Sequence, residues 1–186
     1  AERPTPDAVF KRWTGWLGQK PTVFFGAPTG YAGMMVSPAL PKRGDVALRL
    51  CSSAGEALPR ELGERFAAHF GCEIIDGIGS TEMLHIFISA AGDDIRPGST
   101  GRAVPGYRAT ILGPDGAELG PGEPGRLGVI GPVGCRYLGG ERQRDYVLEG
   151  WNITGDIFHR DEDGYFHYHA RSDNMIVSSG YNIRGP

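Results

Sequence analysis

Cysteine is scarce in this sequence, with three residues among 186. Cys51, Cys72 and Cys135 stand far apart and are odd in number, so they match neither a zinc-binding spacing nor a disulfide framework. We therefore expect three small, buried thiols in a reducing compartment, and we predict that the protein is cytoplasmic.

Three further features are absent, and each excludes a class of protein. The sequence has no run of about 18 apolar residues, which a membrane-spanning helix requires. Its formal net charge is -3, so we expect no affinity for nucleic acid. No Gly-x-Ser-x-Gly motif occurs, which argues against a serine hydrolase triad. The composition, 40% hydrophobic and 22% charged, is typical of a globular domain and leaves the oligomeric state open.

Residues 1–79 alternate between helical and strand patterns. Thr5 and Pro6 predict a helix start, and Leu62, Phe66 and Phe70 recur at helical spacing. The predicted elements are a helix from Pro6, a strand at 21–25, a helix carrying Tyr31, a strand at 47–51, a helix opened by Pro59 and ended by Gly71, and a strand at 73–75. This alternation predicts an α/β fold with a partly parallel sheet and flanking helices.

The pattern changes after about Gly98, where strands become short and turns frequent. Residues 113–116 and 161–164 are turn sequences, and we expect strands at 107–112 and 127–130 with a short helix near 141–147. This half predicts a small antiparallel, barrel-like β unit. We therefore divide the chain into an α/β part at 1–98, a small β subdomain of the same domain at 99–173, and the start of a hinge and C-terminal segment at 174–186.

The most informative stretch is Asp76-Gly77-Ile78-Gly79-Ser80-Thr81-Glu82. A buried strand pattern leads into it, and its two glycines allow the backbone to turn sharply or to approach a ligand closely. The Thr81 hydroxyl and the Glu82 carboxylate suit a phosphate group and its Mg²⁺ ion. An ordinary turn into a helix would use the same residue types, so this stretch alone leaves both interpretations open.

Other polar or aromatic groups follow predicted strands. Asp156 follows a glycine turn and could accept the two hydroxyls of a ribose, or cap its local backbone. Arg171 could contact phosphate or ribose oxygens, or form a surface ion pair. The small residues of Ser53-Ala54-Gly55-Glu56 would let a flat ring approach, although a helix-entry loop has the same composition. Phe24-Phe25 could line a pocket at the end of a strand, or be plain core.

The turn sequence 161–164 predicts a hairpin between strands at 156–159 and 165–168, and three histidines, His159, His167 and His169, lie around it. His167 and His169 fall on one face of a strand, because side chains alternate between the two faces. Two histidines can bind a metal ion, but no cysteine or carboxylate lies at a matching spacing. We therefore do not predict a metal ion at these histidines.

Taken in order, these motifs resemble the adenylate-forming superfamily of acyl-CoA synthetases, adenylation domains and luciferases. The resemblance covers nearly the whole chain and rests on five matches: Phe25-Gly26-Ala27-Pro28-Thr29, Ser53-Ala54-Gly55-Glu56-Ala57-Leu58, Gly79-Ser80-Thr81-Glu82, Thr154-Gly155-Asp156 and Arg171-Ser172-Asp173. Within the superfamily, the stretch from Asp76 to Phe87 is similar to the benzoate-CoA ligase group. The stretch from Gly134 to Ile183 looks closest to 2-aminobenzoate-CoA ligases.

The resemblance implies an AMP-forming acid–thiol ligase. ATP and an aromatic carboxylic acid would give an acyl-adenylate and pyrophosphate, and coenzyme A would then displace AMP to give a thioester. In the first step a carboxylate attacks an α-phosphate that is already anionic, so Mg²⁺ and hydrogen-bond donors must neutralise charge. The acid would be a benzoate, and 2-aminobenzoate is the narrower expectation.

The same resemblance implies a role for each matching residue. Thr81 would hold the α-phosphate and Glu82 would help to hold Mg²⁺, which makes both catalytic. The other expected roles are the adenine slot at Gly55, Glu56, Asp76, Gly77 and Ile78, the ribose site at Asp156 with Arg171 beside it, the aryl pocket at Phe24, Phe25, Ala54 and His85, and the hinge at Asp173.

Two positions depart from the family's pattern. Ile78 stands where many members have an aromatic residue, so we expect apolar packing there rather than stacking on adenine. Asn174 replaces an acid that commonly follows the hinge aspartate. The family's phosphate-binding loop and catalytic lysine have no counterpart among the 186 residues, so we expect a fragment that is inactive by itself. The alternative from another class is a non-catalytic nucleotide-binding or interaction module.

Overall fold

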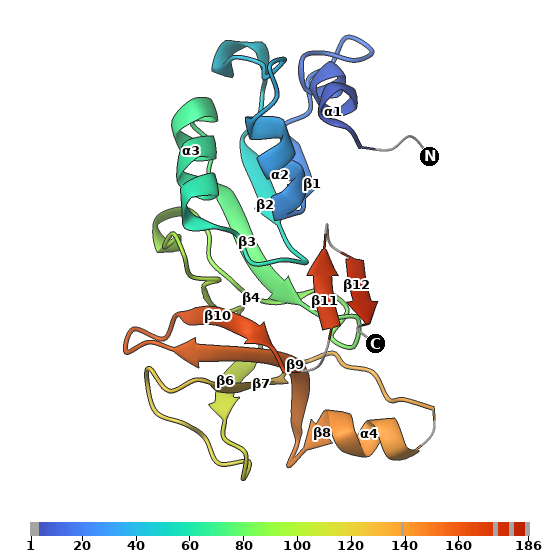
Figure 1. Cartoon of the computed structure of the whole chain (residues 1–186), viewed down its shortest axis with the longest axis vertical. Coiled ribbons are helices and arrows are strands. Elements are labelled where there is room, and N and C mark those ends of the chain that lie inside the picture. Colours follow the sequence, from blue (N-terminus) through green and yellow to red (C-terminus); the bar gives the residue numbers. More distant parts are fainter. Residues whose placement is uncertain (1–3, 139, 173–174, 179–180, 185–186) are drawn as a thin grey trace. The chain divides into compact units, whose positions relative to one another are not determined.

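A computed structural model describes residues 4–138, 140–172, 175–178 and 181–184 (Figure 1). The described residues form two compact units, whose main division falls between Asp76 and Gly77, inside one strand. This division precedes the boundary predicted after residue 98, because Phe87 and Ile88 pack in the core of the second unit. The described residues within 177–181 belong to the first unit, and those from 182 onward belong to the second. Within the described part of the chain, no helix is long and apolar enough to cross a membrane.

The first unit alternates helices and strands, as the sequence predicts. Its elements are α1 (Pro6–Trp13), β1 (Val23–Gly26), α2 (Pro28–Met35), the 3-10 turn η1 (Arg43–Asp45), β2 (Leu50–Ser53), α3 (Arg60–Phe70) and the start of β3 (Ile74–Gly79). The three strands run parallel, with Gly26 beside Ser53 and Ser53 beside Asp76. The predicted partly parallel sheet with flanking helices is therefore confirmed.

The ends of these elements follow local signals. The Thr5 hydroxyl oxygen accepts a hydrogen bond from the Ala8 N–H at the start of α1, and Gly71 ends α3 in the left-handed conformation. Pro59 precedes α3 as its N-cap instead of opening it, because its backbone is extended. Strand β2 begins at Leu50, later than predicted, where its N–H reaches the Thr22 carbonyl oxygen.

Aromatic side chains from the three helices fill the core of the first unit. The Trp13 ring lies edge-to-face on Phe24 at 5.0 Å, and the Tyr31 ring lies edge-to-face on Phe66 at 5.2 Å. This geometry places the positive edge of one ring against the negative face of the next, which stabilises the pair beyond simple burial. The spacing of Phe66 and Phe70 on α3 correctly predicts which face of that helix is buried.

Two of the three cysteines behave as predicted. Cys51 and Cys72 are buried with their sulfur atoms 3.9 Å apart, and burial together with the nearby Cys72 thiol raises the pKa of Cys51 to about 12. A thiol held protonated in this way is chemically inert at neutral pH. The prediction is wrong for Cys135, which is exposed because it lies in the extended segment before α4.

The second unit is an antiparallel β structure. Its elements are the end of β3, β4 (Ile86–Ser89), the 3-10 turn η2 (Gly92–Asp94), β5 (Arg102–Ala103), β6 (Arg108–Leu112), β7 (Gly125–Ile130), α4 (Gly140–Tyr146), β8 (Val147–Leu148), β9 (Trp151–Arg160) and β10 (Phe166–Arg171). Strands β10, β9, β7 and β6 form one curled sheet, and β8 pairs with the start of β9 (Figure 1). This confirms the predicted antiparallel, barrel-like unit. A separate two-stranded sheet joins β11 (Met175–Ser178) and β12 (Tyr181–Arg184).

Gly77 and Gly79 allow β4 to lie close against β3. In the antiparallel register Gly77 faces Ser89 and Gly79 faces Ile86. A Cβ atom on Gly79 would lie 2.4 Å from the His85 carbonyl oxygen, and one on Gly77 would lie 2.7 Å from the Ile86 side chain. The glycines therefore stand in a strand and not in a sharp turn, which was one of the two alternatives, and their close approach to a ligand stays a prediction. The turn that follows leads into β4 and not into a helix.

We predict that Gly79→Ala destabilises the protein by roughly 1–3 kcal/mol, because the new Cβ collides with backbone atoms that cannot rotate away. Gly33→Ala in α2 is the matched control, since a Cβ there meets nothing within 4 Å. Alanine should leave that helix unchanged or stabilise it by up to about 1 kcal/mol. Urea denaturation of both purified variants measures the difference, and equal midpoints would contradict the steric argument.

Candidate active site

The first unit brings several predicted residues to one edge of its parallel strands. Because Gly26, Ser53 and Asp76 are neighbours across β1, β2 and β3, the segments around Phe25, Ala54 and Asp76 meet at the carboxyl ends of these strands. The Ala54 N–H also donates to the Gly26 carbonyl oxygen at 3.3 Å. Open α/β sheets bind ligands at this edge, so the parallel topology places these residues where a site is expected.

The two neighbouring phenylalanines have different environments. Phe24 is half-buried, and its ring packs edge-to-face on Trp13 and on Tyr31. Phe25 points the other way and is 69% exposed. The alternative of a plain core residue therefore applies to Phe24, whereas the ring of Phe25 lies at the surface. Their contact with an aryl acid stays a prediction.

The Glu56 carboxylate lies at the start of α2. Its Oε2 atom accepts hydrogen bonds from the Thr29 N–H at 3.1 Å and from the Thr29 hydroxyl at 2.7 Å. A carboxylate in this position satisfies a backbone donor that the helix leaves unpaired and interacts favourably with the helix dipole. Gly55 precedes it with φ at 89°, a conformation that only glycine adopts without strain. The structure thus gives Glu56 a structural task, and its contact with adenine stays a prediction.

The turn after β3 carries the predicted catalytic pair. The Ser80 hydroxyl oxygen accepts a hydrogen bond from the Met83 N–H at 3.2 Å, and the Met83 side chain is completely buried. This anchor fixes the turn from inside and leaves Thr81 and His85 exposed. Ile78, one strand position before Gly79, packs against the core of the second unit, as expected from its apolar side chain.

Glu82 is held by groups from a distant part of the chain. The Tyr137 hydroxyl donates a hydrogen bond to its Oε1 atom, and the Arg142 guanidinium lies 3.8 Å from the same oxygen. Burial alone would raise the pKa of Glu82, but hydrogen bonds from Tyr137, from its own N–H and from Ser80, with the charge of Arg142, hold this pKa below its ordinary value. The carboxylate is therefore ionised at neutral pH.

Our sequence predictions did not include Tyr137 and Arg142. The two residues lie 55 and 60 positions after Glu82, and no periodic pattern or motif connects the segments. Tyr137 stands in a stretch that contributes to the family resemblance, but nothing there indicates a carboxylate partner. Only the folded chain shows that these side chains reach the turn after β3.

Asp156 and Arg171 form an ion pair between adjacent strands. They face each other directly in the β9–β10 register, with 3.0 Å between Arg171 Nη1 and Asp156 Oδ1. Both side chains are less than one-fifth exposed. The Asp156 N–H donates to the Thr154 hydroxyl oxygen, and the Ser172 N–H donates to the Gly155 carbonyl oxygen at 2.9 Å. Arg171 therefore lies beside Asp156, as predicted. The two side chains form a largely buried ion pair and not the surface ion pair that was the alternative.

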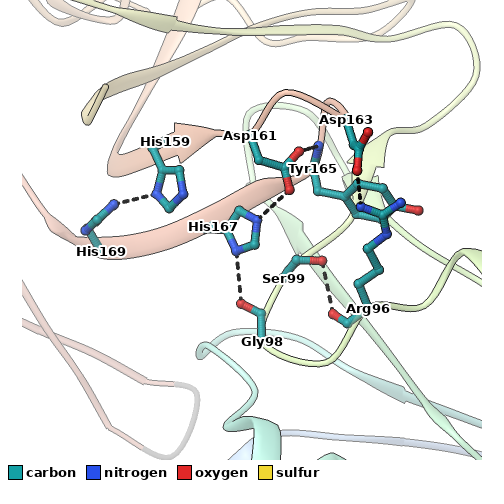
Figure 2. Close-up of polar contacts among 9 residues, drawn as sticks. All are labelled: Arg96, Gly98, Ser99, His159, Asp161, Asp163, Tyr165, His167 and His169. Carbon is teal, nitrogen blue, oxygen red and sulfur yellow. Dashed lines mark hydrogen bonds and ion pairs between the residues drawn. The ribbon is translucent and has the colours of Figure 1, made fainter. Parts of the chain in front are cut away.

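The histidines form a cluster on the β9–β10 hairpin (Figure 2). His159 Nδ1 lies 2.7 Å from His169 Nε2, while the His159 and His167 rings stack with centroids 4.7 Å apart. His167 Nε2 lies 3.0 Å from Asp161 Oδ2, which ties the cluster to the turn. Among the residues that the structure describes, no three His, Cys, Asp or Glu side chains are arranged to hold a metal ion. The predicted hinge residue Asp173 lies outside the described residues.

The sequence of this chain matches a known enzyme family. The AMP-binding enzyme family matches residues 2–137, so the chain belongs to that family. It is 44% identical to a benzoate-CoA ligase of Thauera aromatica, over 98% of this chain and 35% of that protein. The chain therefore spans about a third of the length of the relatives it matches.

Solved structures show the same fold. A benzoate CoA ligase from Burkholderia xenovorans LB400 superimposes with a TM-score of 0.86 at 51% identity, over 92% of this chain and 35% of that one. The anthranilate CoA ligase AuaEII, solved in complex with anthranoyl-AMP, gives a TM-score of 0.83 at 34% identity, over 98% of this chain and 35% of that one. These likenesses confirm the predicted family and the partly parallel α/β fold followed by an antiparallel unit.

We predict that Asp156→Asn lowers the free energy of unfolding by about 3 kcal/mol, because it removes the charged carboxylate that lies 3.0 Å from the largely buried guanidinium of Arg171. The matched control is Asp163→Asn, which breaks the ion pair with Arg96. Those side chains are 63% and 47% exposed, so solvent screens the pair and the loss there should be much smaller. Thermal or urea unfolding compares the two variants, and equal losses would show that burial does not decide the strength of these pairs.

The histidine cluster should make stability depend on pH. Burial and the charges of His167 and His169 lower the pKa of His159, so the unfolded chain binds a proton at this position more tightly than the folded chain does. Stability is therefore lost as pH falls below about 6.5, the ordinary histidine value, toward the lower folded-state pKa. Urea midpoints measured from pH 8 to pH 5 should fall less in His159→Gln than in the unchanged protein. The control His85→Gln removes an exposed histidine elsewhere and should keep the full dependence.

Proposed function

We propose that this chain is part of an ATP-dependent aryl-CoA ligase that activates a benzoate-type acid. The observation that carries the proposal is the 51% identity, at a TM-score of 0.86, to the benzoate CoA ligase from Burkholderia xenovorans LB400. The similarity extends over 92% of this chain, so both compact units take part in it. ATP, an aromatic carboxylic acid and coenzyme A are the proposed substrates, and Mg²⁺ is the proposed metal ion.

The proposed first step joins the acid to AMP. A carboxylate oxygen of the acid attacks the α-phosphorus of ATP, the bond to the β-phosphate oxygen breaks, and pyrophosphate leaves. Negative charge grows on the oxygens around phosphorus, so donors placed there in advance lower the barrier. We assign one donor to the exposed Thr81 hydroxyl, and we assign Mg²⁺ to the ionised Glu82 carboxylate, which together with phosphate oxygens gives the hard oxygen ligands that this ion prefers.

The remaining assignments concern binding of the nucleotide and the acid. Asp156 would accept the ribose hydroxyls, because a carboxylate has about four lone-pair positions and Arg171 does not use them all. Gly55, Glu56, Asp76, Gly77 and Ile78 would contact adenine, and Phe24, Phe25, Ala54 and His85 would contact the aryl group. In the proposed second step the sulfur of coenzyme A attacks the acyl carbon, and AMP leaves.

The identity of the acid is the narrower part of the proposal. The sequence suggested 2-aminobenzoate, and the likeness to AuaEII, titled an anthranilate CoA ligase, supports that acid. The identity to the benzoate ligases is higher, at 44% and 51% against 34%. We therefore expect both acids to be activated, and benzoate is the first acid to test.

The test is an assay of acid-dependent exchange between pyrophosphate and ATP, followed by thioester formation, in the full-length protein. A panel of benzoate, 2-aminobenzoate, 4-hydroxybenzoate and straight-chain fatty acids should show activity with the aryl acids and little with the fatty acids. A preference for fatty acids would contradict the aryl assignment.

A variant of the proposed site tests whether the exchange activity comes from that site. Thr81→Ala should reduce exchange by roughly 10²–10³, the usual cost of removing one preorganised donor. Ser99→Ala removes a hydroxyl that bonds only to a local backbone oxygen in the described structure, and it should leave exchange unchanged. ATP binding with no acid-dependent exchange in the unchanged protein would favour the alternative of a non-catalytic nucleotide-binding module.

A further inference from the structure

Tyr137 reaches Glu82 from the segment that leads into α4. Its hydroxyl donates a hydrogen bond to Glu82 Oε1. A phenol hydroxyl carries its proton at neutral pH, so it acts as the donor to the carboxylate. The contact joins a residue of the proposed metal site to a residue for which the proposed mechanism gives no role.

Three other contacts fix the direction of the Tyr137 side chain. Its backbone N–H donates to the Gln143 side-chain oxygen at 2.8 Å, and its ring meets the Tyr146 ring edge-to-face at 5.7 Å. The Arg142 guanidinium lies over the Tyr137 ring, 4.1 Å from its centre. All three partners belong to α4, so this helix determines where the hydroxyl points.

We propose that Tyr137 is a positioning residue that holds the Glu82 carboxylate in the orientation needed to bind the metal ion of the metal–ATP complex. The inference rests on the proposed function, which assigns Mg²⁺ to Glu82. A carboxylate that binds a metal with one part of its surface is commonly oriented by a hydrogen bond to another part, and loss of that bond typically weakens metal binding by about 10–100-fold.

Tyr137 suits this role better than Arg142 does. Arg142 is 73% exposed and lies 3.8 Å from Glu82 Oε1, so its pairing is loose and screened by solvent. Its positive charge would also repel an arriving cation. A neutral hydroxyl orients the carboxylate and leaves its negative charge available to the metal.

The test measures metal affinity directly in the full-length protein. Mn²⁺ with α,β-methylene-ATP serves as the probe, and electron paramagnetic resonance reports the bound fraction. Tyr137→Phe keeps the ring contacts with Arg142 and Tyr146 and removes only the hydroxyl, and it should weaken Mn²⁺ binding by about 10-fold or more. Tyr107→Phe removes a hydroxyl from a ring that packs near Phe87, and it should bind like the unchanged protein.

Glu82→Gln separates this inference from the proposed function. If Glu82→Gln loses Mn²⁺ binding while Tyr137→Phe keeps full affinity, the positioning role is wrong and the metal site stands. If neither variant changes the affinity, the metal is not at Glu82, and the inference is wrong together with that part of the proposed function. The benzoate assay on the unchanged protein tests the ligase activity independently.

A second measurement distinguishes positioning from general structural damage. The exchange activity lost in Tyr137→Phe should return as the Mg²⁺ concentration is raised, because excess metal compensates for weaker binding. A variant that is merely misfolded would not respond to Mg²⁺. Failure of high Mg²⁺ to restore any activity, in a variant that unfolds at the same urea concentration as the unchanged protein, would overturn the proposal.

Discussion

The close approach of β4 to β3 is the constraint on which the candidate site depends. Residues 74–76 of β3 pair with the parallel strand β2, whereas residues 77–79 pair with the antiparallel strand β4. One strand therefore has a parallel neighbour along its first half and an antiparallel neighbour along its second half. In the second half, a Cβ at Gly79 would collide with the His85 and Ile86 backbone, and one at Gly77 with the Ile86 side chain. The turn that carries Thr81 and Glu82 starts directly after this half. The position of this turn therefore follows from how closely β3 and β4 pack.

Three carboxylates that the sequence assigns to ligand binding are already held by donors within the protein. Glu56 accepts from Thr29, Glu82 accepts from Tyr137, and Asp156 pairs with Arg171. Such contacts fix the direction of an acid before a ligand arrives, so less reorganisation is needed during a reaction. They also limit how each acid can act. A ribose hydroxyl or a metal ion must share the carboxylate with its existing partner, and the lone pairs of a carboxylate permit this sharing.

Local sequence patterns predicted the helices and strands. Contacts between distant segments determine most of the features that the sequence did not predict. The helices carrying Phe10 and Phe66 follow from the period of their apolar residues, and the β9–β10 hairpin follows from its turn sequence. For Gly77 and Gly79 the sequence left a sharp turn and a close approach to a ligand open, because a sequence does not show that another strand needs the space of their missing side chains. Tyr137 was missed for a similar reason, since its contact with Glu82 joins segments 55 residues apart. The pairing of His159 with His169 depends on a register shift in β10, which alternation alone cannot anticipate.

The arrangement around the turn separates groups that hold the fold from groups that can meet a ligand. Met83 is completely buried and fixes the turn, whereas Thr81 and His85 on either side of it are exposed. The same separation occurs at β1, where Phe24 packs in the core and Phe25 is 69% exposed. Exposed side chains on a rigid frame can be replaced at little cost to stability, whereas their anchors cannot.

One fold can therefore serve ligases for different acids. The structures of a benzoate ligase and an anthranilate ligase match this chain almost equally well, at TM-scores of 0.86 and 0.83, although their identities to it are 51% and 34%. Under the proposed function, the choice of acid should be sought in exposed residues such as Phe25 and His85, not in the frame that holds them.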